Sequence, residues 1–552
     1  MKSCVPDNWR WSTPAATVPA RPNREELAMG SYDYIVVGAG SAGAVVASRL
    51  SEDASVRVLL IEAGGTHRHL NVRMPAAFPK QFKTALDWEL YTEPEPFLQG
   101  RSLYHPRAKM LGGCSAMNAM IYIRGNRADF GSWAKDGATG WSYDDVLPLF
   151  RRSENNSRGE STYHGGAGPL HIEDLRSPNE LSHAMVEAMV AAGIERNDDF
   201  NGAEQLGAGL YQINQRRGRR WTTADGYVAP ARRRGNFTVL TDTHVLGVRI
   251  RRERAIGVDV ERRGTREFLC AEREVVLSAG ALHTPQLLML SGIGPADHLA
   301  QQQIDTIVDN PHVGAHLMDH PLYAMNFETS ARGTHAEPQS PRQLLNYFVR
   351  GRGLLTSNFG EVGAFFHTRA GDPAPSMQVI GAPAYFYDHG QGTHHHAAYT
   401  LSLSLVGSLS EGSVRLRSAD PKAAVAMTYN YFAERADMDA MVDGIERIRE
   451  VVATAPLRAV TGPEIHPGAS AGTRAELEQK VRREAQHTYH PSCTARIGSE
   501  ADGVVDAELR VYGVDGLRVA DTSVFPVIPH GNTHAPAVMV GEKAADLLRE
   551  SH

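Results

Sequence analysis

Cysteine is scarce in this sequence: only four of 552 residues are cysteine, and no two stand at CxxC spacing. This excludes a disulfide framework and a cysteine-rich zinc module, and predicts unpaired thiols in a reducing compartment. No run reaches the roughly 18 apolar residues of a membrane helix, so no membrane span is predicted. A formal net charge of −6 gives no support to binding of nucleic acid or of an anionic membrane. The arginine clusters at 216–220 and 232–234 are interpreted as solvated loop charges.

The remaining composition is that of a globular protein, with 42% hydrophobic and 22% charged residues. A chain of this length exceeds what one hydrophobic core supports, so more than one domain is expected. Residues 1–30 lack the continuous apolar stretch of a secretory signal and are expected to form a flexible leader. Together these features predict a cytoplasmic protein.

Residues 32–62 predict a dinucleotide-binding unit. Residues 32–38 are a short apolar run that ends in glycine, as buried parallel strands do. A glycine loop, a helix over 44–50 and a second strand over 55–62 follow at once. This order of strand, GxGxxG loop, helix and strand is the pattern of a βαβ nucleotide-binding unit.

The glycines of the loop have separate expected roles. Gly38 allows a tight turn, Gly40 lets the backbone approach a pyrophosphate, and Gly43 lets helix and strand pack closely. Glu62, at the end of the second strand, is placed to accept hydrogen bonds from a ribose. The loop residues expected to contact the cofactor are Gly38, Gly40, Ser41, Ala42 and Gly43. The unit alone leaves NAD and FAD open.

Two further glycine-containing segments follow. In 105–125, Gly112 and Gly113 would let backbone amides approach a flat ligand, with Ser115 and Asn118 as polar neighbours. The alternative for that segment is a turn between core elements. Residues 274–295 predict a strand, a turn at Gly280, and a helix opened by Thr284 and Pro285.

Histidines near the C-terminus supply the proton chemistry. His490 and His534 are the candidates, because imidazole is the side chain best suited to moving a proton near neutral pH. His487 is expected to serve packing. A nucleotide-binding loop together with a proton-handling pair is what oxidation of an alcohol by a bound redox cofactor requires.

With these segments in view, the chain resembles the glucose–methanol–choline (GMC) family of FAD-dependent oxidoreductases over roughly residues 31–549. The matching segments are 105–125, 280–295, 313–321, 516–526 and the C-terminal histidine pair. The resemblance implies FAD as cofactor. Family members that tether the flavin carry histidine just before the position of Asn118. Met117 stands there in this chain, so non-covalent FAD is expected.

The resemblance also implies roles for individual residues. Glu62 would bind the adenosine ribose, and Val245 would hold the adenine through its backbone. His490 would be the general base while a hydride passes to flavin N5, and His534 would orient the alkoxide. The residues expected near the pyrophosphate, ribityl chain or ring are Asp521, Asn532 and Thr533.

The implied fold is α/β, with a Rossmann-type FAD-binding domain that is discontinuous over 31–325 and 485–552. Residues 326–484 would form an α+β substrate-binding domain, an antiparallel sheet capped by helices, and 68–100 a lid. Residues 399–406 alternate as a strand does, with 412–418 as the expected partner. The aromatic residues considered for the pocket wall are Phe366, Tyr385, Phe386 and Tyr387.

The favoured function is oxidation of a primary alcohol to an aldehyde, with oxygen or a quinone-like molecule as electron acceptor. Residues 489–494 resemble the choline dehydrogenase branch, whereas His534 replaces its usual asparagine and is more typical of aryl-alcohol and sugar oxidases. No carboxylate cage for a quaternary ammonium is evident. A hydroxynitrile-lyase-type enzyme without net redox and a non-catalytic flavin-binding protein remain alternatives. The alcohol and the oligomeric state stay open.

Overall fold

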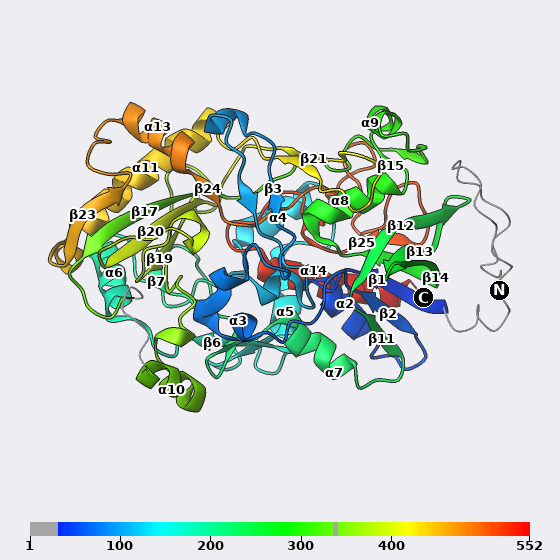
Figure 1. Ribbon diagram of the computed structural model, residues 1–552, viewed down its shortest axis with the longest axis horizontal. Helices are drawn as coiled ribbons and strands as arrows, with labels where there is room; N and C mark the ends of the chain where they lie inside the picture. Colours follow the sequence, from blue (N-terminus) through cyan, green and yellow to red (C-terminus); the bar gives the residue numbers. More distant parts are fainter. Residues whose placement is uncertain (1–30, 335–340, 552) are drawn as a thin grey trace.

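The computed structural model describes residues 31–334 and 341–551 as one elongated molecule with a large sheet near each end (Figure 1). The predicted leader, residues 1–30, lies outside the described residues. Within the described ranges, no helix is long and apolar enough to cross a bilayer.

The first sheet contains the predicted nucleotide-binding unit. Its parallel strands are β1 (Ser31–Val37), β2 (Val58–Ile61), β11 (Phe237–Leu240), β14 (Thr265–Leu277) and β25 (Leu517–Val519). An antiparallel extension of β14 adds β13 (Arg254–Arg262) and β12 (Thr243–Arg251). All four side chains of β2 are buried, as expected for a central parallel strand.

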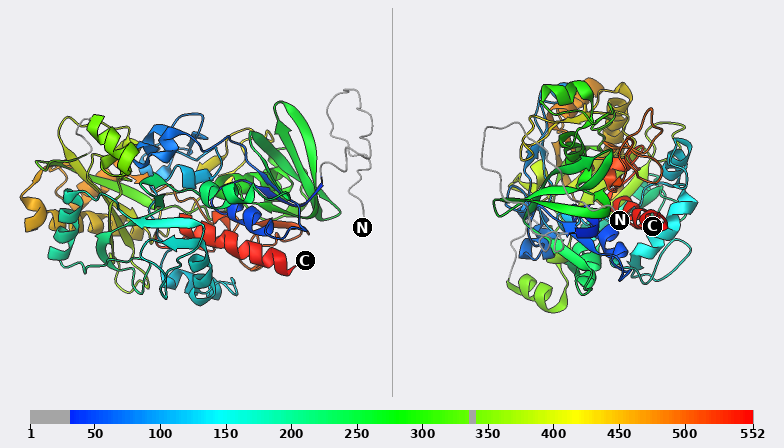
Figure 2. Two further views of the ribbon diagram at one scale, coloured as in Figure 1. Left: turned by 90° about the horizontal axis from the view of Figure 1, so that it is seen from below. Right: turned by 90° about the vertical axis from the view of Figure 1, so that its right-hand side faces the viewer.

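The two ends of the chain meet beside this sheet. Helix α2 (Gly43–Leu50) follows β1, and the C-terminal helix α14 (His534–Glu550) packs against it (Figure 2). A Cβ atom at Gly541 of α14 would lie 2.7 Å from the carbonyl oxygen of Ala42, so glycine permits this close approach. The nucleotide-binding domain is therefore discontinuous in sequence, as predicted.

The second sheet is antiparallel and is covered by helices α6 (Glu180–Ala191) and α11 (Arg435–Val452). Its strands, in spatial order, are β23 (Thr461–His466), β17 (Pro321–Thr329), β20 (Ala398–Leu405), β19 (Met377–Ala382), β18 (Val362–Phe366) and β7 (Gly207–Leu210), with β24 (Gln486–His487) also on β17. Every side chain of β20 is buried. The α+β class predicted for this region is confirmed.

Three details differ from the sequence predictions. Strand β20 pairs with β17 and β19, whereas β21 (Ser413–Arg415) pairs with β22 (Ala426–Thr428), so the predicted pairing of 399–406 with 412–418 is wrong. The second sheet also extends outside 326–484, because a sheet takes strands from wherever the chain returns to its edge. Helix α8 (Gly280–Leu290) begins at Gly280, four residues before the predicted start.

The remaining elements connect and cover the two sheets. The helices are α3 (Leu70–Arg73), α4 (Arg127–Lys135), α5 (Tyr143–Ser153), α7 (Ala229–Ala231), α9 (Ala296–Gln301), α10 (Pro341–Arg350), α12 (Ala455–Arg458) and α13 (Arg474–Glu484), with short helical turns η1 (Pro75–Gln81) and η5 (Leu354–Thr356). The short strands are β3 (Leu90–Tyr91), β4 (Tyr104–His105), β5 (Glu154–Asn156), β6 (Leu170–Asp174), β8 (Gln212–Ile213), β9 (Gln215–Arg216), β10 (Arg219–Arg220), β15 (Ile293–Gly294) and β16 (Val308–Asp309).

Candidate active site

A cavity of about 330 Å³ is lined by residues of both sheets and by the C-terminal histidine segments. The described residues that were predicted for the site and that line it are Gly38, Gly40, Ser41, Ala42, Glu62, Gly113, Asn118, Val245, His490, Asp521, Asn532, Thr533 and His534. Gly43, Gly112 and Ser115 are not part of the lining. Most of the predicted residues are therefore brought together around one space.

The two glycine segments form one cradle, which we define as residues 38–43 together with 112–113. A Cβ atom at Gly113 would lie 2.7 Å from the Cα atom of Gly40, so the loops touch through their backbones. A Cβ atom at Gly40 itself would meet no atom within 4 Å, because its outer side faces the cavity. Gly43 has a packing role: its Cβ atom would lie 2.0 Å from the carbonyl oxygen of Gly38. The cradle thus exposes backbone to a ligand.

Glu62 links the cradle to the end of β2. Its Oε2 accepts a hydrogen bond from the Ala39 N–H (3.1 Å), and its Oε1 accepts one from the Gly64 N–H (2.9 Å). Burial raises the pKa of this carboxyl to about 7. The carboxylate orders two turns at the mouth of the cradle while it lines the cavity.

Asp521 joins the C-terminal segment to the start of α8. Its Oδ2 accepts hydrogen bonds from the Gly280 N–H (2.8 Å) and the Thr284 hydroxyl (2.6 Å), and its Oδ1 accepts one from the Ser523 N–H (2.8 Å). Burial raises the pKa of the carboxyl. Thr284, predicted to open the helix, instead anchors this carboxylate.

Arg220 is a buried residue that sequence reasoning missed. It was grouped with the solvated arginines, yet it is buried and its Nη1 donates to the Asn118 side-chain oxygen (2.8 Å). Burial lowers the pKa of its guanidinium to about 9. Ser115, by contrast, donates its hydroxyl to the Gly112 carbonyl (2.6 Å) and accepts from the Thr223 N–H (3.1 Å), so it stabilises the turn from behind.

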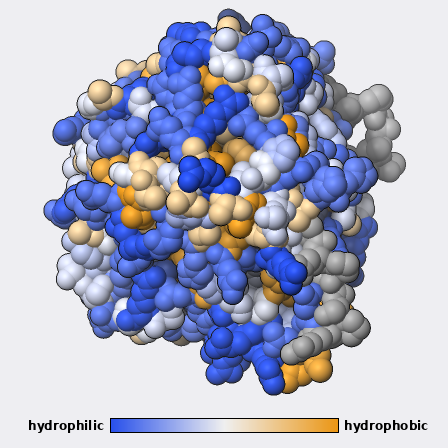
Figure 3. All heavy atoms as spheres, turned by 90° about the vertical axis from the view of Figure 1, so that its left-hand side faces the viewer, coloured by the Kyte–Doolittle hydropathy of each residue, from blue (hydrophilic) through white to orange (hydrophobic). Residues whose placement is uncertain are grey.

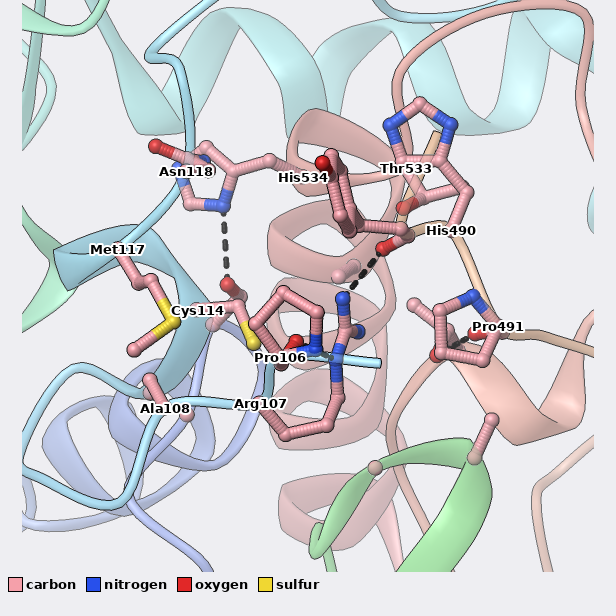
Figure 4. A pocket seen from close by; sticks show the side chains of 18 of the residues that line it. Pro106, Arg107, Ala108, Cys114, Met117, Asn118, His490, Pro491, Thr533 and His534 are labelled. Atoms are coloured by element: carbon pink, nitrogen blue, oxygen red, sulfur yellow. Dashed lines mark hydrogen bonds between the residues drawn. The ribbon is translucent and has the colours of Figure 1, made fainter. Parts of the chain in front are cut away.

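His490 lines the cavity, and each of its ring nitrogens lies beside a polar side chain. Its Nδ1 lies 3.0 Å from Nδ1 of His320, and its Nε2 lies 3.3 Å from the amide nitrogen of Asn532. Burial, and then the positive charge of Arg107, lower the pKa of His490 to about 3. Arg107 itself donates to the carbonyl of Tyr489 (2.7 Å; Figure 4). At neutral pH the imidazole is uncharged and able to accept a proton.

His534 has different surroundings. It is the first residue of α14, and its Nδ1 lies 2.9 Å from the Ser41 hydroxyl of the cradle. Its Nε2 is buried without a hydrogen-bond partner, and burial lowers its pKa to about 4. Among the described residues no hydrogen bond joins His534 to His490, and the two rings lie apart in Figure 4. The side chain that lies beside Nε2 of His490 is Asn532, which the sequence had suggested only for the cofactor.

Behind His490 lies a buried histidine layer, defined as His105, His320, His487 and His490 around Asp319. One oxygen of the Asp319 carboxylate accepts the His490 backbone N–H (2.8 Å), and the other lies 3.4 Å from His105 Nε2. The rings of His105 and His487 stack with their centroids 4.1 Å apart, and one possible ligand atom from each of His105, His487 and Asp319 lies within 4.8 Å of the others. His487 therefore packs, as predicted. No spacing rule pointed to His105, Asp319 or His320.

The outer wall of the cavity is aromatic. It includes Phe386, one of the four aromatic residues considered from the sequence, whereas Phe366, Tyr385 and Tyr387 are not in the lining. The predicted lid, 68–100, contributes three aromatic side chains to the lining. The aromatic residues on this wall are Phe78, Phe82, Phe359, Phe386 and Tyr489, whereas Trp88 contacts His244 and His283 of the lining. The only carboxylates among the described lining residues are Glu62 and Asp521, both already bonded to backbone N–H groups.

Comparison with known proteins identifies the family of this chain. A GMC oxidoreductase family model matches residues 32–322, and a second GMC oxidoreductase model matches residues 408–541. An uncharacterised GMC-type oxidoreductase of Mycobacterium bovis is 43% identical over 527 residues, 94% of this chain and 99% of the relative. An oxygen-dependent choline dehydrogenase of Sinorhizobium fredii is 41% identical over 533 residues, 93% and 95%. The crystal structure of pyridoxine 4-oxidase from Mesorbium loti superposes with a TM-score of 0.87 at 30% identity, over 94% of this chain and 100% of that one.

Proposed function

The chain belongs to the GMC oxidoreductase family, and we propose that it uses non-covalently bound FAD to oxidise a primary alcohol to an aldehyde. His490 would be the general base. The observation that carries this proposal is geometric: His490 lines the same cavity as the glycine cradle, with its Nε2 3.3 Å from the amide nitrogen of Asn532, another lining residue. A base and a dinucleotide site on one cavity are what the reaction needs.

The residues present fit FAD. The side of Gly40 that a Cβ atom would occupy is open, and the Nε2 atom of His534 is buried without a partner, so both can face a ligand. The N-terminus of α14 begins at His534 and supplies a partial positive charge on the same side. When bound, FAD supplies the acceptor for the two electrons that leave the alcohol carbon. Met117, which lines the cavity, offers no nucleophile that could tether a flavin.

His490 has the task of removing the hydroxyl proton. Its neutral Nε2 accepts that proton while the aldehyde forms, a contribution of about 10²–10⁴-fold in rate for a positioned base. The contact from Asn532 is long, at 3.3 Å, so a substrate hydroxyl can take its place. The Asn532 amide is then free to donate to the substrate oxygen. Both side chains come from the C-terminal segment, which α14 anchors against the cradle.

The lining favours an uncharged alcohol over a quaternary ammonium. Neither lining carboxylate is free to face a cation, and the guanidinium of Arg107 adds positive charge. The aromatic wall instead suits a ring or an alkyl group. Relatives of this chain include an oxygen-dependent choline dehydrogenase and a pyridoxine 4-oxidase. Of these two chemistries, an uncharged hydroxymethyl on an aromatic ring agrees better with the wall.

The test is an anaerobic titration of the purified flavoprotein with choline, benzyl alcohol, pyridoxine, hydroxymethylfurfural and long aliphatic alcohols. Loss of the oxidised flavin absorbance on adding an aromatic alcohol, but not choline, is expected. Air is then admitted: rapid return of the absorbance identifies oxygen as acceptor, and slow return identifies a dehydrogenase. An oxidised flavin that survives every alcohol would contradict the proposal and favour a lyase or a binding protein.

A further inference from the structure

We propose that Gln378, on β19 of the second sheet, is a positioning residue that fixes which nitrogen of His490 carries the proton, acting through Asn532. This inference rests on the proposed role of His490 as base. Gln378 touches neither the cradle nor His490 directly. It is buried, and its amide joins the second sheet to the C-terminal segment.

The orientation of the Gln378 amide follows from Tyr211. The Tyr211 hydroxyl donates its only hydrogen to the backbone carbonyl of Val379 (2.7 Å), which can only accept. Tyr211 must therefore accept from Gln378, so the group 2.9 Å away is the amide nitrogen. The Gln378 side-chain oxygen is buried with no hydrogen-bond partner. That arrangement is costly and indicates a residue placed for its two N–H groups.

The second hydrogen of the Gln378 amide nitrogen fixes the orientation of the Asn532 side-chain amide. Gln378 Nε2 donates to the Asn532 side-chain oxygen (3.0 Å), so the Asn532 nitrogen is the atom that faces His490. An amide nitrogen only donates, so Nε2 of His490 must be unprotonated. The His490 proton then sits on Nδ1 and is donated to Nδ1 of His320 (3.0 Å). The second sheet thus holds the base in its proton-accepting tautomer.

The sharpest test is Gln378→Glu, which keeps the shape and replaces the donors with acceptors. Asn532 would then turn its nitrogen toward residue 378 and its oxygen toward His490, forcing a proton onto Nε2. We expect flavin reduction by alcohol at neutral pH to slow by at least about tenfold. The acidic limb of the pH–rate profile, where the base becomes protonated, should move to higher pH, because a carboxylate now lies two hydrogen bonds from the imidazole and raises its pKa.

The matched control is Gln378→Leu, which removes the donors without adding charge. It should slow reduction less than Gln378→Glu and leave the pH profile in place. Two results would overturn the proposed chain of hydrogen bonds from Gln378 through Asn532 to His490: equal rates of flavin reduction in the two variants, or a Gln378→Glu pH–rate profile that coincides with the wild-type profile. If the Gln378→Glu protein does not fold, Tyr211→Phe removes the hydroxyl that orients the amide and should slow reduction by a few-fold; wild-type reduction in that variant would equally overturn this chain of hydrogen bonds. A His490→Ala protein with wild-type reduction would instead refute the proposed function itself.

A second, independent feature is the exposed apolar face of α10. The exposed fractions are 37% for Leu344, 65% for Leu345, 53% for Phe348 and 72% for Val349. These are four of the ten large apolar side chains exposed among the described residues. Figure 3 shows apolar atoms at the lower margin of the molecule, where α10 lies in Figure 1. Single exposed apolar residues are ordinary, but four on one helix form a patch.

The surroundings of this patch are basic, although the whole chain carries a formal charge of −6. Residues 341–353 contain no aspartate or glutamate. The charges of Arg73 and Arg219 act on the hydroxyl of Tyr347, the buried residue of α10. The basic residues in and beside the helix are Arg73, Arg219, Arg350 and Arg352, together with Arg176, which donates to the Gly351 carbonyl and pairs with Glu173.

The geometry points to α10 as a docking element for an anionic lipid surface. An apolar helix face with arginines on its flanks, and no acidic residue within 341–353, is complementary to that surface. On its inner side Tyr347 packs with Met74 and Ala77 of the 68–100 segment. The next residue along that segment, Phe78, lines the cavity. Docking would bring this wall of the cavity to the bilayer, where lipophilic alcohols and quinones partition.

The test is co-sedimentation of the holoenzyme with vesicles of phosphatidylcholine alone or with added phosphatidylglycerol. We expect binding to the anionic vesicles only, weakened by salt and reduced at least about tenfold by Leu345→Gln with Val349→Gln. Leu409→Gln, at a residue 53% exposed elsewhere on the surface, is the control and should bind normally. Equal binding to both vesicle types, or α10-dependent dimers without vesicle binding in size-exclusion chromatography, would overturn the proposal.

Discussion

The cradle and the histidine layer face one cavity but are built in different ways. The cradle is backbone against backbone: Gly40 and Gly113 touch because neither carries a side chain. The histidine layer is side chain against side chain, with rings from β4, from the residue before β17, from β24 and from the segment after β24 gathered around Asp319. The cradle can therefore be recognised from a short motif, whereas the layer exists only after distant segments have folded together.

Burial affects ionisable groups of both regions in the same sense. It raises the pKa of Glu62 to about 7 and lowers the pKa of His490 to about 3, which favours the uncharged form in each case. For His490 the uncharged form is the one that can act as a base. For Glu62 it opposes the ionised form that best accepts two backbone N–H groups. The same dry environment thus assists one region and strains the other.

Replacing the base should give the largest effect. His490→Ala removes the group that takes the hydroxyl proton, and we expect flavin reduction at least about 100-fold slower in stopped-flow measurements. The flavin spectrum should be retained, because the cradle is untouched. Wild-type reduction kinetics in this variant would contradict the assignment of proton transfer to the histidine layer and of cofactor binding to the cradle.

The Glu62 carboxyl should make the free energy of unfolding of the FAD-free protein depend on pH. Its folded pKa, about 7, is above its ordinary value of 4.5, so its contribution to stability is present below pH 4.5 and is lost as pH rises to about 7. Relative to Glu62→Gln, the wild-type FAD-free protein should lose up to about 3 kcal/mol of unfolding free energy across that window. Urea unfolding at several pH values measures this. Parallel curves for the two proteins would show that Glu62 is not strained.

Adding one methyl group where the loops touch tests the backbone character of the cradle. Gly113 has a φ of +49° and its Cβ would lie 2.7 Å from Gly40, so Gly113→Ala should weaken FAD binding about tenfold through overpacking. Gly100→Ala is the matched control, since Gly100 has a φ of +73° and open space around it. Fluorescence titration of the FAD-free proteins gives both affinities. Equal losses would assign the effect to backbone strain alone.

The smallest effect is expected at His534. Its hydrogen bond to Ser41 belongs to the cradle, and His534→Asn retains a polar group there. We expect flavin reduction to slow by less than about tenfold, the scale of one net hydrogen bond. A loss as large as that of His490→Ala would mean that the two histidines act as a pair, and that the separation between them closes when the ligands bind.

Much of the fold followed from local pattern. The strand, glycine loop, helix and strand of residues 32–62 were predicted because hydrophobic period and glycine placement act within a few turns of chain. Pairing partners were not predictable: β20 alternates as a strand should, but its neighbours are decided by which buried faces fit.

The sequence by itself determined the nucleotide-binding unit and the family, and it supplied His490 as the candidate base, because glycine freedom and imidazole chemistry belong to single residues. Only the tertiary structure decided that Asn532 rather than His534 contacts His490, that Arg220 is buried, and that Asp319 and Gln378 support the site. A hydrogen bond needs its two atoms within about 3 Å. The separation of two residues in the sequence does not predict whether their atoms come that close. Such contacts can therefore be identified only from the packed arrangement of the two sheets.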